Sequence, residues 1–144
     1  MVTRTSEAEW RGPLADGVGT VKLGSGAFEG RYSFDSRFQD GAGTNPEELL
    51  GAAHAACFSM ALSLVLGSAG FTPRRITTSA AVEIQRSDDG FAIPRIRLTT
   101  NADVPDIDLA TFTGHAETAK RGCPVSKALA GVEIVLDAHL AEPG

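Results

Sequence analysis

The sequence predicts an α+β fold, in which a largely antiparallel sheet packs on a long central buried helix within one domain, residues 1–144. Two features carry this prediction. Apolar and polar residues alternate in several short segments, as they do in half-buried strands, and one uncharged segment, 49–70, is too long for a strand. Strands are expected before and after that helix, which is typical of an α+β chain of one-domain length.

The strands are predicted from their alternation and from the turns between them. Residues 17–34 indicate a β-hairpin around a Gly24-Ser25-Gly26 turn, and Trp10 is expected on a short earlier strand. Later in the chain, 75–86 and 93–104 indicate two more strands. One face of the second of these is expected to be buried, because five residues alternate there with polar ones: Ile96, Leu98, Thr100, Ala102 and Val104.

The long helix has a clear start. Asn45 can serve as its N-cap, Pro46 suits the first helical position and Glu48 completes a capping-box pattern, so we expect a helix that ends near 67–70. By length alone 49–70 could span a bilayer, but Ala, Gly and Ser dilute its hydrophobicity. A helix buried on all sides has the same composition, and we therefore predict a core helix and no membrane span.

The last third of the chain predicts two helices and a strand. Asp108 can cap a helix that runs through Arg121 and stops at Gly122, and a short helix is expected over 124–130. Alternation over 132–140 predicts the last strand.

The composition excludes several classes of function. The chain has 13 Lys and Arg against 18 Asp and Glu, a net charge of −5, which argues against a general nucleic-acid binder. Residues 1–10 have no apolar segment of the kind that directs secretion, so we expect a cytoplasmic protein. Two cysteines are too few for a disulfide scaffold, and in that compartment both thiols should start out reduced.

Cys57 lies in the middle of the long apolar helix, where a cysteine is most often a small hydrophobic residue. A thiol becomes a nucleophile as the thiolate, which needs positive charge nearby, and the middle of this helix has none. Arg37 is the nearest residue before the helix that could supply this positive charge. Glu47 could cap the helix or hold such an arginine in a bidentate pair.

Cys123 differs from Cys57 because it lies between Gly122 and Pro124, at the expected start of a short helix. A helix N-terminus lowers the pKa of a thiol, and a loop position gives mobility, which suits a resolving cysteine. The two cysteines are too far apart in sequence for a CxxC motif, so they can meet only through the fold.

His54 precedes Cys57 by three residues and shares its helix face. Three interpretations stay open. His54 could be a base for Cys57, it could bind zinc together with Cys57, Cys123 and His115, or it could be a packed or lid residue near the thiol.

Three segments resemble the signature of the OsmC/Ohr family, named for osmotically inducible protein C and organic hydroperoxide resistance protein. The resemblance extends over essentially the whole chain, and the central segment is most similar to the OsmC branch. The segments are Ser33-Phe34-Asp35-Ser36-Arg37-Phe38, GTNPEELLGAAHAACFSMAL over 43–62, and Arg121-Gly122-Cys123-Pro124-Val125-Ser126.

The resemblance implies a thiol peroxidase that reduces organic hydroperoxides in oxidative or osmotic stress defence. It makes Cys57 the peroxidatic and Cys123 the resolving cysteine, Arg37 the residue that activates the thiolate and Glu47 the residue that positions Arg37. It also implies an intertwined homodimer and a dithiol reductant such as a lipoylated protein, with no metal or organic cofactor.

Helix geometry adds a hypothesis about that dimer. Glu47 and Cys57 are ten residues apart, or about 15 Å along one straight helix, and they fall on different faces. A second copy packed antiparallel would bring its Glu47 beside Cys57, which predicts active sites shared between two chains. Two rival functions remain: a non-enzymatic binding module for a small molecule or lipid, with incidental thiols, and a Cys–His hydrolase that depends on His54.

Overall fold

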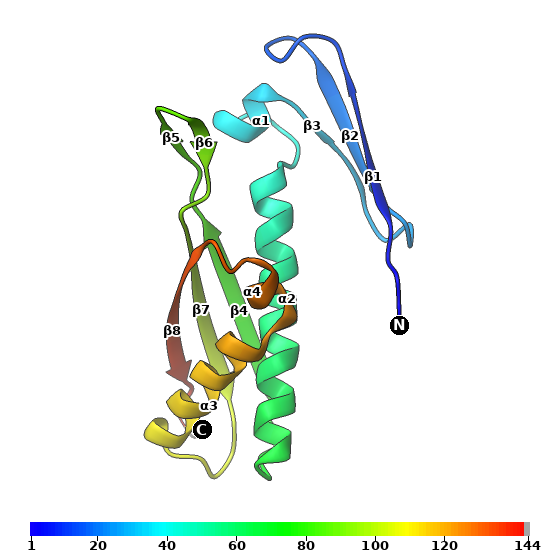
Figure 1. Ribbon diagram of the computed structural model, residues 1–144. Coiled ribbons are helices and arrows are strands. Elements are labelled where there is room, and N and C mark those ends of the chain that lie inside the picture. The colour runs from blue at the N-terminus through cyan, green and yellow to red at the C-terminus, as the bar shows by residue number, and fades with distance from the viewer. Residues whose placement is uncertain (143–144) are drawn as a thin grey trace. The chain divides into compact units, whose positions relative to one another are not determined.

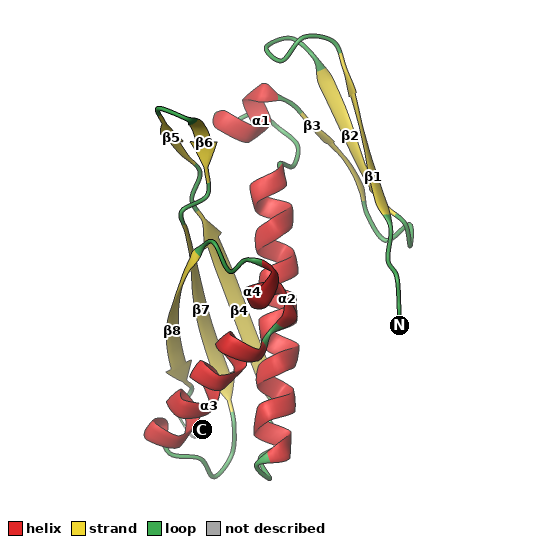
Figure 2. Cartoon of the chain, viewed as in Figure 1, coloured by secondary structure: helices red, strands yellow, loops and turns green. Residues whose placement is uncertain are grey.

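The computed structural model describes residues 1–142, which form two compact units, Met1–Leu49 and the chain from Leu50 onward (Figure 1). Each unit has its own sheet, as the secondary-structure colouring makes plain (Figure 2). The presence of helices together with mostly antiparallel strands confirms the predicted α+β class. That the chain forms a single domain stays a prediction.

The first unit contains a three-stranded antiparallel sheet in the order β1 (Ser6–Arg11), β2 (Val18–Leu23) and β3 (Glu29–Tyr32). The predicted hairpin and the predicted earlier strand are both confirmed. Trp10 on β1 packs against Tyr32 on β3, with ring centroids 5.4 Å apart.

A short helix, α1 (Phe34–Phe38), follows β3 and was not predicted. Its N-cap is Ser33, whose hydroxyl accepts a hydrogen bond from the backbone N–H of Ser36, while the Ser36 hydroxyl accepts one from the N–H of Ser33. These reciprocal bonds satisfy donors that the helix itself leaves free, which is why so short a helix forms here.

The long helix α2 (Pro46–Ser68) begins and ends as predicted. Asn45 Oδ1 accepts a 2.7 Å hydrogen bond from the N–H of Glu48. The Glu48 carboxylate accepts from the Thr44 hydroxyl at 2.7 Å instead of the Asn45 N–H, so the N-cap is confirmed while the return bond comes from one residue earlier.

The sheet of the second unit has the order β4-β7-β8, formed by β4 (Arg75–Val82), β7 (Arg95–Asp103) and β8 (Glu133–Leu140). β4 and β7 are antiparallel, but β7 and β8 are parallel. A parallel pair needs a crossover connection, which here contains α3 (Leu109–Gly122) and α4 (Pro124–Ala128).

Local signals place the remaining elements. Asp108 caps α3 through a 2.8 Å bond from the N–H of Thr111, as predicted. The turn between β4 and β7 extends into a small hairpin, β5 (Gln85–Ser87) and β6 (Gly90–Ala92).

The core of the second unit lies between one face of the β4-β7-β8 sheet and helices α2 and α3. The predicted buried face of β7 is confirmed through Ala102, and Val104 just beyond it is also buried. The fully buried apolar residues of the two helices pack against this face: Phe58, Leu62 and Leu66 from α2, and Phe112, Ala116 and Ala119 from α3.

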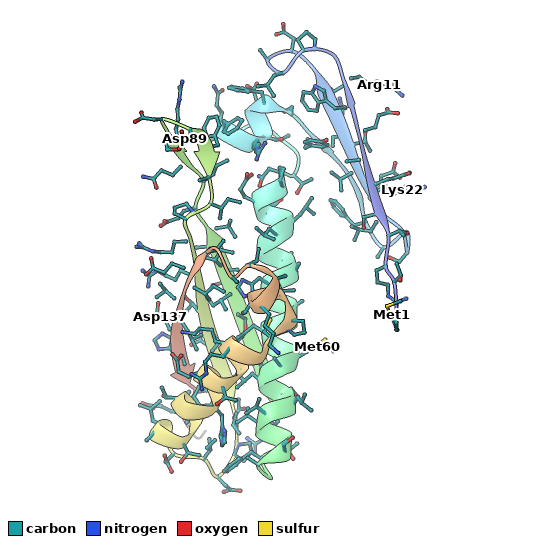
Figure 3. All side chains as sticks on the ribbon, in the orientation of Figure 1. Met1, Arg11, Lys22, Met60, Asp89 and Asp137 are labelled. Carbon is teal, nitrogen blue, oxygen red and sulfur yellow. The ribbon has the colours of Figure 1, made fainter. Side chains whose placement is uncertain are left out.

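The prediction that α2 is buried on all sides is wrong for a single chain. Its opposite face is exposed: Ala53 and Ala56 lie there, Met60 is 76% exposed and Leu64 is 71% exposed. Met60 points away from the sheet in Figure 3. By length and composition alone α2 could cross a membrane, but its other face packs in the core, as in a core helix of a soluble fold.

Candidate active site

The fold brings the two cysteines together although they are far apart in sequence. Cys57 lies on α2 and Cys123 lies at the junction of α3 and α4, and the two thiols are close enough that each shifts the pKa of the other. Both sulfurs are free, with no disulfide between them. The two cysteines are therefore a pair of neighbouring, reduced thiols.

The surroundings of Cys57 favour its neutral form. Burial raises the pKa of the Cys57 thiol, and hydrogen bonding with Cys123 raises it further, while the N–H of Val125 acts in the opposite direction. The causes of this pKa shift include no positively charged side chain. That an arginine from another segment supplies the positive charge stays a prediction.

Cys123 has the opposite tendency. Burial raises the pKa of its thiol, but hydrogen bonds from Cys57 and from the N–H and hydroxyl of Ser126 outweigh burial and lower that pKa. Cys123 is the N-cap of α4, which supports the expectation of a lowered pKa at a helix start. Cys123 lies between two helices as expected, is fully buried, and its N–H bonds to the carbonyl of Ala119 at 2.9 Å, so its mobility stays a prediction.

Arg37 and Glu47 form a second preassembled pair. Arg37 Nη2 donates to Glu47 Oε1 at 2.8 Å, and Arg37 Nε donates to both carboxylate oxygens at 3.0 and 3.3 Å. Glu47 is only 6% exposed. The structure has the pair with an arginine that was the second of the two interpretations of Glu47, and this contact fixes the plane of the guanidinium while leaving Nη1 free of this carboxylate.

The loop between α1 and α2 holds this ion pair in register. The Asn45 side chain donates to the carbonyl of Ser36 at 3.1 Å, which ties the start of α2 to α1. Gly43 has a φ of 119°, and a Cβ there would lie 2.6 Å from the Arg31 carbonyl oxygen. A residue with a side chain would therefore disturb the loop that brings Arg37 to Glu47.

His54 is buried and bonds away from Cys57, which favours the interpretation of a packed residue near the thiol. Its Nε2 lies 2.8 Å from Ser126 Oγ and bonds to that hydroxyl rather than to Cys57. Burial lowers the pKa of His54 and keeps the imidazole neutral. His115 instead packs near Phe71, and among residues 1–142 no group of three or more His, Cys, Asp or Glu could hold a metal.

The predicted site residues thus gather as two pairs, Cys57 with Cys123 in the second unit and Arg37 with Glu47 in the first. Sequence reasoning did not single out Ser126, which contacts both Cys123 and His54. A signal was available, because Ser126 stands three residues after Cys123, in the first turn of the expected short helix.

Comparison with known proteins gives a consistent result. The family model for OsmC-like protein matches residues 39–137. Peroxiredoxin OsmC of Escherichia coli strain K12 is 51% identical over 140 residues, which cover 96% of this chain and 97% of that protein. Organic hydroperoxide resistance protein-like 2 of Staphylococcus epidermidis is 30% identical over 134 residues, which cover 82% of this chain and 92% of that protein.

Solved structures agree with the sequence relatives. The crystal structure of an organic hydroperoxide resistance protein from Elizabethkingia anophelis superimposes with a TM-score of 0.73 and 28% identity, over 97% of this chain and 99% of that one. The matched region 39–137 contains Glu47, Cys57 and Cys123. This chain belongs to the OsmC-like protein family.

Proposed function

We propose that this protein is a cysteine-based peroxidase that reduces organic hydroperoxides to alcohols. The reduced Cys57–Cys123 dithiol is the observation that carries the proposal, because a paired, partly buried dithiol is what a peroxidase with a resolving cysteine requires. The names of the relatives, a peroxiredoxin and organic hydroperoxide resistance proteins, support it.

In the first step the Cys57 thiolate attacks the distal oxygen of the hydroperoxide. The S–O bond forms, the O–O bond breaks, and the departing alkoxide takes up a proton and leaves as an alcohol, so that Cys57 becomes a sulfenic acid. Because burial raises the pKa of Cys57, the step needs a cation beside the sulfur. We assign this role to Arg37, held in orientation by Glu47.

In the second step Cys123 attacks the oxidised sulfur of Cys57, a disulfide forms and water leaves. An external dithiol, such as a lipoyl group, then exchanges with this disulfide and restores both thiols. No group outside the chain other than hydroperoxide and dithiol enters this cycle.

We further propose that two chains build each site. The exposed apolar face of α2, with Met60 and Leu64 one turn apart on it, suits a second copy of the same helix, since contiguous apolar patches on a surface mark interaction sites. Glu47 and Arg37 are paired within one chain, so they would act together on Cys57 and Cys123 of the other chain. We place this dimer in the cytoplasm, where the resting thiols stay reduced.

A peroxidase assay tests the function directly. Reduced protein is mixed with cumene hydroperoxide, tert-butyl hydroperoxide or hydrogen peroxide, with dihydrolipoamide as the dithiol. We expect stoichiometric loss of free thiol and repeated turnover, faster with the two organic hydroperoxides. Unchanged thiols would support the non-enzymatic binding module instead. A Cys–His hydrolase is already disfavoured by geometry, because His54 bonds to Ser126.

Replacing Cys123 with serine should separate the two steps. The Cys123→Ser variant should still react once with hydroperoxide, because Cys57 remains, and should then stop as a sulfenic acid that excess hydroperoxide oxidises to sulfinic acid. Intact-protein mass spectrometry follows these species. Formation of an intrachain disulfide mass in this variant at the wild-type rate would contradict the resolving role of Cys123.

A further inference from the structure

A buried hydrogen bond connects α2 to α4 next to the cysteine pair. His54 is 0% exposed, and its Nε2 lies 2.8 Å from the hydroxyl of Ser126, which is 7% exposed. Ser126 in turn lies in the first turn of α4, three residues after the N-cap Cys123, and its hydroxyl lowers the pKa of the Cys123 thiol. The three side chains therefore form a continuous polar path from His54 to the sulfur of Cys123.

The direction of the hydrogen bonds in this path follows from the other ring nitrogen. His54 Nδ1 is buried and has no hydrogen-bond partner. A buried N–H without a partner is rarer and costs more than a bare acceptor nitrogen, so the proton of this neutral imidazole belongs on Nε2. Nε2–H then donates to Ser126 Oγ, which frees the Ser126 O–H to donate to Cys123 Sγ.

We propose that His54 and Ser126 are positioning residues for the second chemical step, in which a donor path from the imidazole through the hydroxyl holds Cys123 as the attacking thiolate. This inference rests on the proposed peroxidase cycle. It adds two residues to that cycle, neither of which contacts the hydroperoxide.

The step itself balances within the cysteine pair. A lone pair of the Cys123 thiolate forms the S–S bond to Cys57, the S–O bond of the sulfenic acid breaks, and the leaving hydroxide takes up a proton to become water. The sulfur of Cys123 is oxidised and the sulfur of Cys57 is reduced. Donors aimed at Cys123 raise the fraction of thiolate available for this attack, which sets its rate near neutral pH.

A purely structural role is the competing explanation, since the same bond joins α2 to α4 and would orient them. The two roles differ in their dependence on pH. If Ser126 stabilises the thiolate, a variant without its hydroxyl regains the lost rate once the pH is high enough to ionise Cys123 unaided. If Ser126 only orients α4, the loss persists at every pH. The titratable groups that face Cys123 from α2 are Cys57 and, through Ser126, His54.

The experiment measures how fast the sulfenic acid becomes a disulfide. Reduced protein is mixed with one equivalent of cumene hydroperoxide, quenched at intervals with acid, and both oxidised forms are quantified by intact mass. We compare Ser126→Ala with Ser126→Thr, which keeps the hydroxyl. Ser59→Ala is the matched control, because Ser59 also makes a 2.8 Å hydroxyl bond in the second unit, to Thr78 on β4 and not to Cys123.

Ser126→Ala is expected to slow disulfide formation about tenfold at neutral pH, the effect of losing one hydrogen bond to a charged group. The difference in rate between Ser126→Ala and the wild type should disappear at alkaline pH. Ser126→Thr should restore most of the rate, and Ser59→Ala should match the wild type. His54→Leu should also slow the step, and His54→Gln, which keeps an N–H donor, should retain most of it.

Three results would overturn the inference: a wild-type rate of disulfide formation in Ser126→Ala, a slower rate that is the same fraction of wild type at every pH, or no effect of His54→Leu. Failure of the proposed function looks different, because the sulfenic acid would then form in none of the proteins, including the wild type.

Discussion

Replacing Cys57 with serine is expected to abolish hydroperoxide reduction while leaving the fold intact. A serine hydroxyl ionises far less readily than a thiol, and its oxygen cannot form the sulfenic acid on which the cycle depends. Cys57 is half-buried and the change is nearly isosteric, so the free energy of unfolding should change by no more than about 1 kcal/mol. The measurement is hydroperoxide consumption by the purified variant, together with its thermal unfolding curve.

Cys123→Ser is the matched control for this loss. Both variants lack one thiol from the same buried pair, but only Cys123→Ser should consume its first equivalent of hydroperoxide. Turnover by Cys57→Ser would show that the peroxidatic role belongs elsewhere. Equal single-turnover behaviour in the two variants would show that the thiols are interchangeable, which the opposite directions of their pKa shifts do not suggest.

The sequence predicted those helices and strands that depend on residues close together in the chain. Asn45 before Pro46 and Asp108 before Leu109 mark helix starts, because the cap contacts lie within one turn, and the structure has both bonds. The alternation of β7 predicted its buried face for the same reason. The start of α1 was missed although Ser33 and Ser36 form a capping box, because a five-residue helix leaves no periodic pattern.

The parts that could not be predicted depend on distant segments. The parallel pairing of β7 with β8 is set by the crossover through α3 and α4, which the alternation of β8 does not encode. The contact between Cys57 and Cys123 was predicted from the family resemblance, because no rule based on sequence spacing relates residues so far apart. Amino-acid composition could not predict the exposed face of α2, because a helix covered by its own chain and a helix covered by a partner contain the same kinds of residue.

That exposed face leads to the prediction with the clearest gain of activity. If each site combines Arg37 and Glu47 of one chain with both cysteines of the other, then Cys57→Ser and Glu47→Ala are each inactive as homodimers. They differ in which half of the site they damage. Co-expression with two different affinity tags allows the mixed dimer to be isolated.

In the mixed dimer, one site would then carry both lesions and the other would carry none. We therefore expect about half of the wild-type activity to return, because one of two equivalent sites is whole. A site built within one chain predicts the opposite, since each site keeps one lesion and the mixed dimer stays as inactive as its parents.

A second mixed dimer provides the control. Cys57→Ser and Cys123→Ser damage two residues that the structure brings together within one unit of one chain. Combining them leaves one lesion in each site, so this dimer should show no sustained turnover. Recovery in the Cys57→Ser and Glu47→Ala pair but not in this control would mean that the arginine–glutamate pair of one protomer serves the cysteine pair of its partner. The exposed apolar face of α2 would then be the first candidate for the surface that joins the two protomers.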